Sequence, residues 1–492
     1  MPLTRLLPFE LAQEFGIVPM LDEGTSIMVA TAPHMTVAAL AAARQRLGKP
    51  LRTQAVASER FREIMTQAYA TQSVKSSGEL ASAVTRLAGS ADDSDLLSSI
   101  TSDSDAPAVR IISELLREAL ARGASDIHFD ATEAGGRVRL RVDGVLKDAR
   151  ETDTATHASL VARCKVMAVL DIAERRLPQD GRLQVTIGGH RVDVRVATLP
   201  TQHGERLVLR LLDTSAARLD LAALGFTTTT LQAVRAAVRM PHGLVLVTGP
   251  TGSGKTTTLY AAVTELDRER LNVVSVEDPV EYALDRVAQT QVNPRIELSF
   301  ARALRSILRH DPDVIIVGEI RDRETAEIAI QASLTGHLVL ASLHTNTAGA
   351  AITRLADMGV EPYLLASSLR GVLAQRLVRK LCVDCRKIRD ATVEEVAALE
   401  RHGALPTGGI ARLFDPAGCA ACAGTGYRGR VGLYRWLPIT ADIARLMHSK
   451  AADTELESLA VENGWPSIAS DGARYLVDGT TSLAEVLRVV TA

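Results

Sequence analysis

The chain has 492 residues, of which 46% are apolar, so it is long enough to bury several cores, and two to four domains are expected. Its formal net charge is -2 and only 3% of its residues are aromatic. Both values argue against a surface built to hold nucleic acid, through backbone charge or base stacking, and they weaken a DNA-motor interpretation without excluding it.

The first residues, MPLTRLLPFELAQEFGIVPM, do not resemble a secretory signal. Glu10 and Glu14 stand where such a signal needs an uninterrupted apolar core. No run in the sequence approaches the ~20 apolar residues of a membrane-spanning helix. We therefore expect a cytoplasmic protein, which could still attach to a membrane from that side.

Residues 1–72 predict a small N-terminal α/β domain. They contain helical patterns in PFELAQEF, VAALAAARQRLG and ERFREIMTQAYA and a strand-like run in SIMVATA. Residues 73–105 are rich in Ser and Asp and poor in large apolar side chains, so they cannot bury enough surface to offset the entropy of ordering. This stretch predicts a flexible acidic linker, with an ordered helix around LASAVTRL as the alternative.

Residues 106–215 predict an α+β domain that precedes the core. An amphipathic helix ends near Gly123, and strand-like alternation follows in GRVRLRVDGVL and HRVDVRVATLP. In residues 216–378 helices alternate with short buried strands, as in a parallel α/β sheet. Residues 379–432 hold four of the five cysteines, and residues 433–492 are predicted to be mostly helical.

The stretch GPTGSGKTTTLY fits the phosphate-loop pattern GxxxxGK[ST], with a buried strand, GLVLV, before it and a helix, TTTLYAAVTEL, after it. In this pattern backbone amides face the phosphates, Lys255 reaches the outer phosphates and the Thr256 hydroxyl can bind magnesium. The predicted nucleotide-binding residues are Gly249, Pro250, Thr251, Gly252, Ser253, Gly254, Lys255, Thr256 and Thr257.

Two further predicted strands end in acidic residues. NVVSV leads into Glu277, Asp278 and Glu281, and DVIIVGE ends at Glu319, where an Asp is more common. Because parallel strands end at one edge of a sheet, we expect these carboxylates to face the phosphate loop, although any single one could be a helix cap or a solvated residue. We predict that Glu281 orients the attacking water, and that Glu319 binds magnesium through water or shares that role.

The stretch TGHLVLASLHTN places a histidine at each end of a predicted buried strand. His344 lies at the carboxyl end, on the same edge as the acidic residues, and is a candidate sensor of the terminal phosphate. His337 begins the strand and is expected to support structure. For either residue, a hydrogen-bonded core histidine is the alternative.

Arg302, Arg305 and Arg309 recur at helical spacing in SFARALRSILRHDPD. A solvated helix face is the simplest interpretation. The alternative is that this row supplies positive charge to the phosphates of a neighbouring subunit.

The cysteines form two pairs, CVDC at Cys382 and Cys385 and CAAC at Cys419 and Cys422. Four thiolates in two such pairs suit tetrahedral zinc, with a redox-active pair as the alternative. The zinc is expected to be structural, because four cysteine ligands leave no position open for substrate. Cys164 stands alone and is interpreted as a small buried residue.

The stretch RLVRKLCVDCRKIR surrounds the first cysteine pair with basic residues against one acid, Asp384. A solvated basic face is the simplest interpretation for most of these side chains, and a patch that contacts anionic lipid headgroups or an acidic partner is the alternative. The basic residues are Arg376, Arg379, Lys380, Arg386, Lys387 and Arg389.

The runs GASDIHFD, DIAERRLPQDGR, LPTQHGERLVLRLL, SVEDPVEY and SILRHDPDVIIVGEIRDRETAEIAIQASLTGHLVLASLHTN resemble the secretion and pilus assembly ATPases of the type II secretion and type IV pilus superfamily, from about residue 105 to 440. The resemblance implies a RecA-like core and a PAS-like preceding domain. It implies that Lys255 and Thr256 hold phosphate and magnesium, that Glu281 is the base and that Glu319 is the Walker B acid.

The resemblance also implies a set of phosphate-contacting arginines from the preceding domain and from the subunit boundary of the core: Arg195, Arg210, Arg305 and Arg309. The implied cofactors are ATP, magnesium and zinc. The implied partners are five further copies in a homohexamer, the cytoplasmic domain of a bitopic inner-membrane protein, and an inner-membrane platform protein, with no nucleic acid.

The short N-terminal domain, acidic linker and tetracysteine insert look most like the type II secretion ATPase, which drives pseudopilus assembly at the inner membrane of Gram-negative bacteria. A type IV pilus assembly ATPase is the alternative, and a nucleic-acid translocase is a more distant one.

Overall fold

The computed structural model describes residues 16–22, 25–32, 35–56, 107–187, 190–213, 220–405 and 409–490, together with Ala12 and Phe61. By its internal contacts the chain divides into two compact units, residues 1–98 and 99–492. The expected helices in PFELAQEF and ERFREIMTQAYA lie outside the described residues apart from Ala12 and Phe61, and so do the expected linker and the alternative helix in it. None of the helices in the described ranges has the length and apolar character needed to cross a bilayer.

The first unit contains a three-stranded sheet in the order β1-β2-β3. Its strands are β1 (Ile17–Asp22), β2 (Ile27–Thr31) and β3 (Leu51–Ala55), with β1 antiparallel and β3 parallel to β2. The helix α3 (Val37–Leu47) connects β2 to β3 and ends at Gly48, whose φ of 68° suits glycine. The strand in SIMVATA and the helix in VAALAAARQRLG are confirmed, whereas the sequence patterns did not predict β1 and β3.

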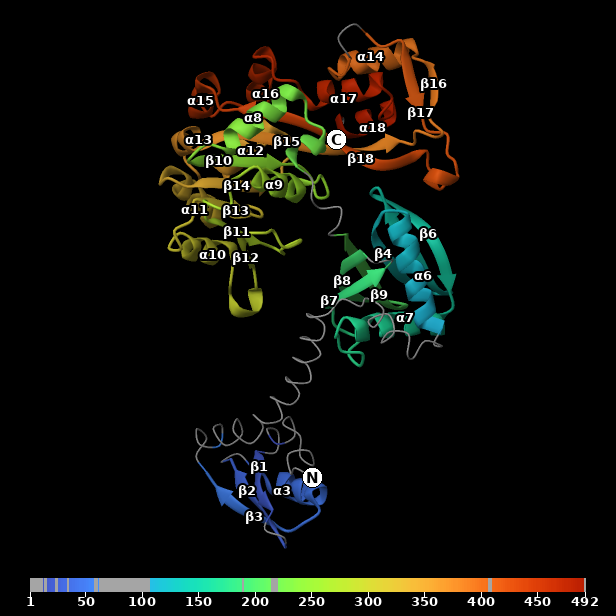
Figure 1. The fold of residues 1–492 in the computed structure, drawn as a ribbon, viewed down its shortest axis with the longest axis vertical. Coiled ribbons are helices and arrows are strands. Elements are labelled where there is room, and N and C mark those ends of the chain that lie inside the picture. Colours follow the sequence, from blue (N-terminus) through green and yellow to red (C-terminus); the bar gives the residue numbers. More distant parts are fainter. Residues whose placement is uncertain are drawn as a thin grey trace. The chain divides into compact units, whose positions relative to one another are not determined.

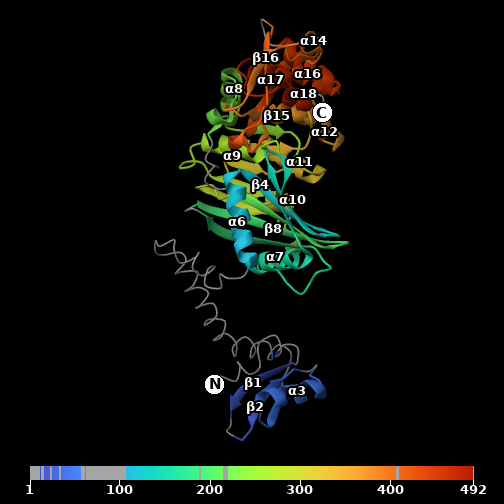
Figure 2. The same ribbon diagram turned by 90° about the vertical axis from the view of Figure 1, so that its right-hand side faces the viewer.

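The second unit begins with an α+β arrangement. Its strands are β4 (Ala124–Thr132), β5 (Gly135–Val142), β6 (Val145–Thr152), β7 (Gln179–Ile187), β8 (His190–Thr201) and β9 (Gly204–Asp213). They form an antiparallel sheet in the order β6-β5-β4-β9-β8-β7, and α6 (Pro107–Ala121) and α7 (Thr154–Met167) pack against it (Figures 1 and 2). The predicted amphipathic helix and both predicted strand regions are confirmed. Cys164 is buried in this core, as expected.

A seven-stranded sheet in the order β12-β11-β13-β14-β10-β15-β18 forms the centre of the second unit. Its strands are β10 (Gly243–Thr248), β11 (Val273–Glu277), β12 (Val287–Gln291), β13 (Val314–Val317), β14 (Leu338–Leu343), β15 (Leu369–Leu381) and β18 (Tyr427–Pro438). The first six strands in this order are parallel, as predicted, but the edge strand β18 pairs antiparallel with β15. β18 reverses direction because the chain returns along the edge of β15 instead of crossing over the sheet through a helix.

Helices cover both faces of this sheet. They are α8 (Thr228–Val238), α9 (Lys255–Thr264), α10 (Phe300–Ile307), α11 (Arg323–Leu334), α12 (Ala348–Asp357) and α13 (Pro362–Ser368). Leu244 and Leu246 of β10 pack in the core that includes α10, α11 and α12, whereas Val245 and Val247 pack in the core that includes α8 and α9. Both faces of β10 are therefore buried, which explains why its sequence is continuously apolar.

The tetracysteine segment leaves the sheet at the end of β15 and returns at the start of β18. It contains α14 (Val393–Arg401) and the antiparallel pair β16 (Lys387–Asp390) and β17 (Arg412–Asp415). The helices that follow β18 are α15 (Ala441–His448), α16 (Asp453–Glu462), α17 (Ile468–Val477) and α18 (Leu483–Val490). The expected boundaries at residues 378 and 432 fall inside β15 and β18, because these strands extend from the core sheet into the tetracysteine segment.

A buried carboxylate attaches the last helix to β15. Glu485 of α18 accepts hydrogen bonds from the backbone N–H and the Nη2 of Arg379, each at 2.8 Å. Burial alone would raise the pKa of Glu485, but the hydrogen bonds from Arg488 and Arg379 lower it to about 2. Glu485 therefore stays ionised and depends on these arginines for compensation.

Candidate active site and metal site

The phosphate loop lies between β10 and α9, where the sequence predicted it. Gly249 has a φ of 153°, and a Cβ there would lie 2.5 Å from the carbonyl oxygen of Gln375, so only glycine fits. Gly254 ends the loop at a φ of 88° and begins α9, which directs its first backbone N–H groups into the loop. This geometry suits phosphate at the positive end of a helix.

The ammonium of Lys255 is buried under this loop, with the residue 9% exposed. Its Nζ donates hydrogen bonds to the carbonyl oxygens of Gly249 at 2.8 Å and Pro250 at 3.2 Å, and it pairs with no carboxylate among the described residues. Burial lowers the pKa of Lys255 to about 8, while the charge of Glu319 acts to raise it and that of Arg376 to lower it. A buried cation that has only carbonyl partners is ready to bind an anion such as phosphate.

Three neighbouring strands, β11, β13 and β14, carry one cluster of charges at their carboxyl ends. Arg321 pairs with Glu319, beyond β13, and its Nη1 lies 3.1 Å from Oδ2 of Asp278, beyond β11. The Nε2 of His344, beyond β14, lies 2.9 Å from Oε2 of Glu319. The structure thus brings Asp278, Glu319 and His344 together at one edge, in agreement with the parallel topology.

Glu277 does not join this cluster, so the expectation that it faces the crevice was wrong. Only 3% of it is exposed, and its carboxylate accepts hydrogen bonds from the hydroxyl of Tyr260, from Ser275 at 2.5 Å and from Gln289 at 3.1 Å. Because Glu277 still belongs to β11, its side chain follows the alternation of the strand and points into the protein. It ties β11 to α9 and β12.

Glu281 lies in the loop after β11 and contacts the preceding α+β part of the unit. The Nη2 of Arg195, on β8, lies 3.0 Å from Oε2 of Glu281 and donates to the carbonyl oxygen of Val280 at 2.8 Å. Burial lowers the pKa of Arg195, and the charge of Glu281 acts in the opposite direction. One candidate arginine is therefore placed on the loop that carries the candidate base.

The other three candidate arginines have their contacts elsewhere. The Nε of Arg210 donates to Asp126 in its own sheet at 2.8 Å, and Arg305 pairs with Glu324. Arg309 donates to the carbonyl oxygen of Arg305 at 2.7 Å and follows α10, which ends at Ile307, so the expected helical row extends beyond the helix itself. His337 bonds to the carbonyl oxygen of Ala332 at 2.9 Å, as expected of a structural residue.

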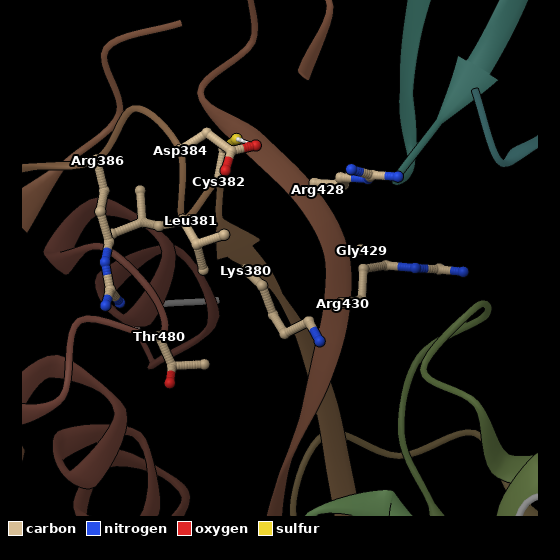
Figure 3. Close-up of a pocket in the computed structure, with 10 residues that line it drawn as sticks. Lys380, Leu381, Cys382, Asp384, Arg386, Arg428, Gly429, Arg430 and Thr480 are labelled. Atoms are coloured by element: carbon tan, nitrogen blue, oxygen red, sulfur yellow. Dashed lines mark hydrogen bonds between the residues drawn. The ribbon is translucent and has the colours of Figure 1, made fainter. Parts of the chain in front are cut away.

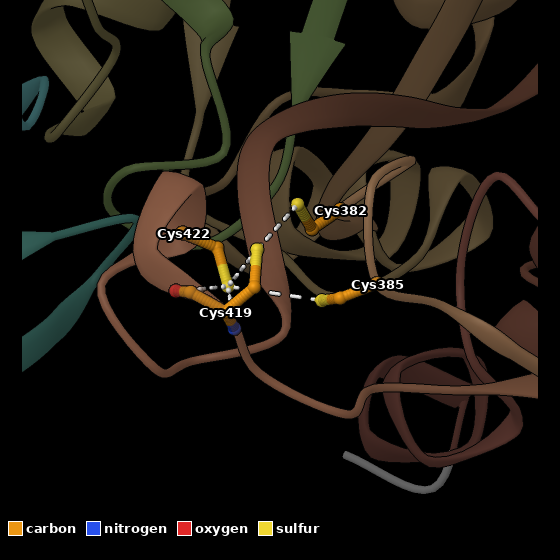
Figure 4. Close-up of side chains that lie close together, drawn as sticks. All are labelled: Cys382, Cys385, Cys419 and Cys422. Carbon is orange, nitrogen blue, oxygen red and sulfur yellow. Dashed lines mark hydrogen bonds between the residues drawn. The ribbon is translucent and has the colours of Figure 1, made fainter.

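The four paired cysteines lie close together, with all four Sγ atoms within 4.8 Å of one another (Figure 4). The distances are 3.9 Å from Cys382 to Cys419, 3.9 Å from Cys385 to Cys422, and 3.8 Å from Cys419 to Cys422. Zinc–sulfur bonds of about 2.3 Å at tetrahedral angles put sulfur atoms about 3.8 Å apart, so the cluster fits zinc. Burial alone would raise the pKa of the Cys422 thiol, but hydrogen bonds from the N–H groups of Cys419 and Gly426 lower it to about 6, which favours the thiolate a metal needs.

Comparison with known proteins identifies the chain. Residues 101–488 match the family described as type II/IV secretion system protein. The chain belongs to this family. Residues 6–69 also match the family model of a domain of the GSPII protein E.

Relatives narrow the assignment. A type II secretion system protein E of Pseudomonas aeruginosa is 46% identical over 492 residues, which cover 99% of this chain and 96% of that protein. A type II secretion system ATPase E of Vibrio cholerae is 51% identical over 390 residues, which cover 79% of this chain and 76% of that protein. The chain is therefore a type II secretion ATPase, and the predicted family, enzyme class and function are confirmed.

Solved structures support the fold. The crystal structure of the pilus retraction motor PilT with bound ADP is 26% identical with a TM-score of 0.51, and covers 77% of this chain and 96% of that chain. The Legionella pneumophila ATPase DotB is 20% identical with a TM-score of 0.58, and covers 77% of this chain and 95% of that chain. The predicted fold class is confirmed.

The basic stretch around the first cysteine pair of this secretion ATPase is only partly solvated. Arg376 is buried, and Arg379 pairs with Glu485. Arg389 pairs with Glu395 and Asp415, each at 2.6 Å. The interpretation of a solvated face was wrong for Arg376, because it lies on a buried part of β15, whereas Arg379 and Arg389 are partly exposed and pair with acidic residues.

Two of the remaining basic residues of this stretch, Lys380 and Arg386, line a hollow of about 590 Å³ beside the cysteine cluster, together with Arg428 and Arg430 of β18 (Figure 3). Lys380 of β15 and Arg428 and Arg430 of β18 extend from paired strands. The Nε of Arg430 lies 3.9 Å from Oδ1 of Asp143. Like charges on paired strands repel one another, so this hollow, which we call the knuckle pocket, suits an anionic ligand. Its lining residues are Lys380, Leu381, Cys382, Val383, Asp384, Arg386, Arg428, Gly429, Arg430 and Thr480.

Sequence reasoning missed two residues of the secretion ATPase site. Arg321 follows Glu319 by two residues, and an arginine so close to an acid at a strand end could have indicated the pairing. Gln375 accepts a hydrogen bond from the hydroxyl of Thr258 at 2.7 Å and donates to the carbonyl oxygen of Ser253, which fixes the phosphate loop to β15. The sequence carries no local signal for Gln375, because it depends on the pairing of β10 with β15.

Proposed function

We propose that this secretion ATPase works as a homohexamer on the cytoplasmic face of the inner membrane of a Gram-negative bacterium, where it hydrolyses magnesium ATP to drive pseudopilus assembly. The observation that carries the proposal is the contact of Arg195 with the loop of Glu281. This contact joins the α+β part to the edge of the core sheet where β11, β13 and β14 end. A change in the charge at that edge can therefore be converted into movement of the α+β part.

The residues at the edge have separate roles in this proposal. Lys255 and the amides of the phosphate loop bind the outer phosphates, and Thr256 with Glu319 would hold magnesium, which supplies further positive charge to the transferring phosphoryl group. Glu281 orients the attacking water once it is released from Arg195. Arg195 is then free to neutralise charge that develops on the phosphates.

Arg321 and His344 fix the orientation of the Glu319 carboxylate, which would bind the metal. A carboxylate with two cationic or hydrogen-bonding neighbours keeps a fixed orientation at little cost at the moment of reaction. We infer that His344 reports the state of the terminal phosphate to Glu319 through their 2.9 Å contact. Arg210, Arg305 and Arg309 would reach phosphate only after domain closure or from a neighbouring subunit.

Glu319→Gln is expected to lower turnover about 100-fold or more and to leave nucleotide binding nearly unchanged, because the amide keeps the shape but loses the charge. Glu281→Gln should behave similarly. Glu269→Gln is the matched control, since Glu269 has an exposed carboxylate on the same part of the chain. Steady-state hydrolysis and the binding of a fluorescent ADP analogue separate the two effects. Wild-type turnover in both variants would contradict these roles, whereas lost turnover with wild-type secretion would indicate an ATP-gated scaffold.

We propose two partners, one for the N-terminal part of the chain and one for the core. Residues 6–69 match a domain of the GSPII protein E, and we propose that this part docks on the cytoplasmic domain of a bitopic inner-membrane protein. A second contact with an inner-membrane platform protein would receive the movement of the core. No nucleic acid is needed in this cycle.

The knuckle pocket suggests a contact with anionic phospholipid. Each basic residue near an anionic surface contributes about 1 kcal/mol of binding, so phosphatidylglycerol vesicles should bind the chain. We expect this binding to raise ATP turnover several-fold. Lys380→Gln with Arg428→Gln should weaken vesicle binding about tenfold or more without changing turnover in the absence of lipid. Equal turnover with phosphatidylglycerol and phosphatidylcholine would rule out this contact.

A further inference from the structure

Arg376 is a buried cation that no carboxylate among the described residues neutralises. Only 7% of it is exposed. Its guanidinium donates to the carbonyl oxygen of Asn346 at 2.7 Å, to the side-chain oxygen of Asn346 at 3.3 Å and to the carbonyl oxygen of Gln375 at 3.3 Å. Burial lowers its pKa. Carbonyl dipoles offset only part of the cost of taking a charge out of water, so this side chain has an unmet demand for an anion.

Strand order places this guanidinium at the phosphate loop. β10 lies between β14 and β15, and Thr248, its last residue, is level with Leu343 of β14 and Ala374 of β15. Asn346 follows Leu343 by three residues and Arg376 follows Ala374 by two, so both lie beyond the end of β10, one on each side of it. Their hydrogen bond must therefore pass the end of β10, where the phosphate loop begins at Gly249.

Lys255 lies at the same place. Its ammonium bonds to the carbonyl oxygens of Gly249 and Pro250, and Arg376 is close enough for its charge to lower the pKa of Lys255. Two buried cations therefore lie beside one loop, each with only carbonyl partners in the described structure. One of them, Lys255, belongs to the phosphate-binding pattern, and the same anion can neutralise both.

We propose that Arg376 is a phosphate-binding residue of the nucleotide site, which shares the outer phosphates with Lys255. The planar guanidinium can bind two phosphate oxygens while Asn346 holds its other edge. The neighbouring residue on β15, Gln375, fixes the loop itself through Ser253 and Thr258. β15 thus supplies Gln375, which fixes the phosphate loop, and Arg376, which binds the phosphates.

The same strand offers a matched control, Arg379, whose partner Glu485 is buried. In the full chain, Arg376→Gln is expected to raise the KM for magnesium ATP about tenfold or more and to reduce the rise in Tm caused by ADP, without lowering the Tm of the nucleotide-free protein. Arg379→Gln should do the opposite, lowering the nucleotide-free Tm because the buried Glu485 keeps only one of its two arginine partners, Arg488, and keeping the KM. Arg376→Lys should fall between wild type and Arg376→Gln, since it keeps the charge but loses the planar fork.

A wild-type KM in Arg376→Gln, or a nucleotide-free Tm lowered as much as in Arg379→Gln, would overturn the proposal and make Arg376 a structural residue. The inference rests on nucleotide binding at the phosphate loop, which Lys255→Ala tests separately. If Lys255→Ala kept the wild-type KM and the full rise in Tm with ADP, the nucleotide site itself would be misplaced. Failure of Arg376→Gln alone leaves that site intact.

Discussion

Replacing Lys255 by alanine is expected to lower ATP turnover about 100-fold or more while the chain stays folded. The Nζ of Lys255 bonds only to the carbonyl oxygens of Gly249 and Pro250, so its removal breaks no ion pair. The buried ammonium lacks a carboxylate, and losing it relieves a desolvation cost that offsets the lost hydrogen bonds. Turnover falls because the outer phosphates lose the cation that neutralises them in the transition state.

Hydrolysis of magnesium ATP and thermal unfolding of the same preparation check this result. Lys387→Ala serves as the control, since Lys387 is an exposed lysine on β16, away from the phosphate loop. Lys255→Ala should match the control in Tm and differ from it in turnover. A Lys255→Ala chain with wild-type turnover would contradict the assignment of the loop.

Loss of the zinc ion that we propose the four paired cysteines bind is expected to have the largest effect on stability. Structural zinc contributes roughly 10–16 kcal/mol in small domains, comparable with the whole stability of about 5–15 kcal/mol of a typical protein. A zinc ion held by the four Sγ atoms would join the end of β15 to the segment just before β18, so Cys382→Ser with Cys385→Ser should loosen the segment between these strands. We expect a large fall in Tm and in soluble yield.

Elemental analysis of the purified chain measures the metal directly, with one zinc per chain expected in wild type and none in the double variant. Cys164→Ala is the matched control, because Cys164 is buried in another core and should leave the zinc content unchanged. Wild-type protein without zinc but with a disulfide within either cysteine pair would support the redox alternative instead.

Much of the site was predictable because its signals are local. The buried run before Gly249 and the glycine pattern after it are contiguous in sequence, and the parallel topology then places the residues after β11, β13 and β14 at the same edge. The cysteine pairs were likewise readable from their spacing. In each case the chemistry needs residues at fixed short intervals, which a sequence displays.

The errors arose where the burial or the pairing of a side chain depends on the fold. Glu277 is the last residue of β11, and its side chain is buried. The acidic run EDPVE does not show where the strand ends, so it does not reveal this burial. The sequence also does not indicate that Arg379 pairs with Glu485, because the two residues are 106 positions apart. The antiparallel β18 depends on the path of the tetracysteine excursion, which spacing alone does not determine.

The contact of Arg195 with Glu281 illustrates the same limit. Family resemblance implied that Arg195 reaches the nucleotide, but nothing in the sequence indicated that it would pair with the candidate base, Glu281. Arg376 stood in a basic run that suggested solvent or lipid, and its position became clear only from the order β14-β10-β15.

The most direct test of the central claim is protein secretion by cells whose copy of this ATPase carries Lys255→Ala. Hydrolysis at the phosphate loop is proposed to be the source of the movement, so secretion should stop although the variant is folded and present at the wild-type level. Secretion at the wild-type rate from a folded Lys255→Ala chain would contradict the account.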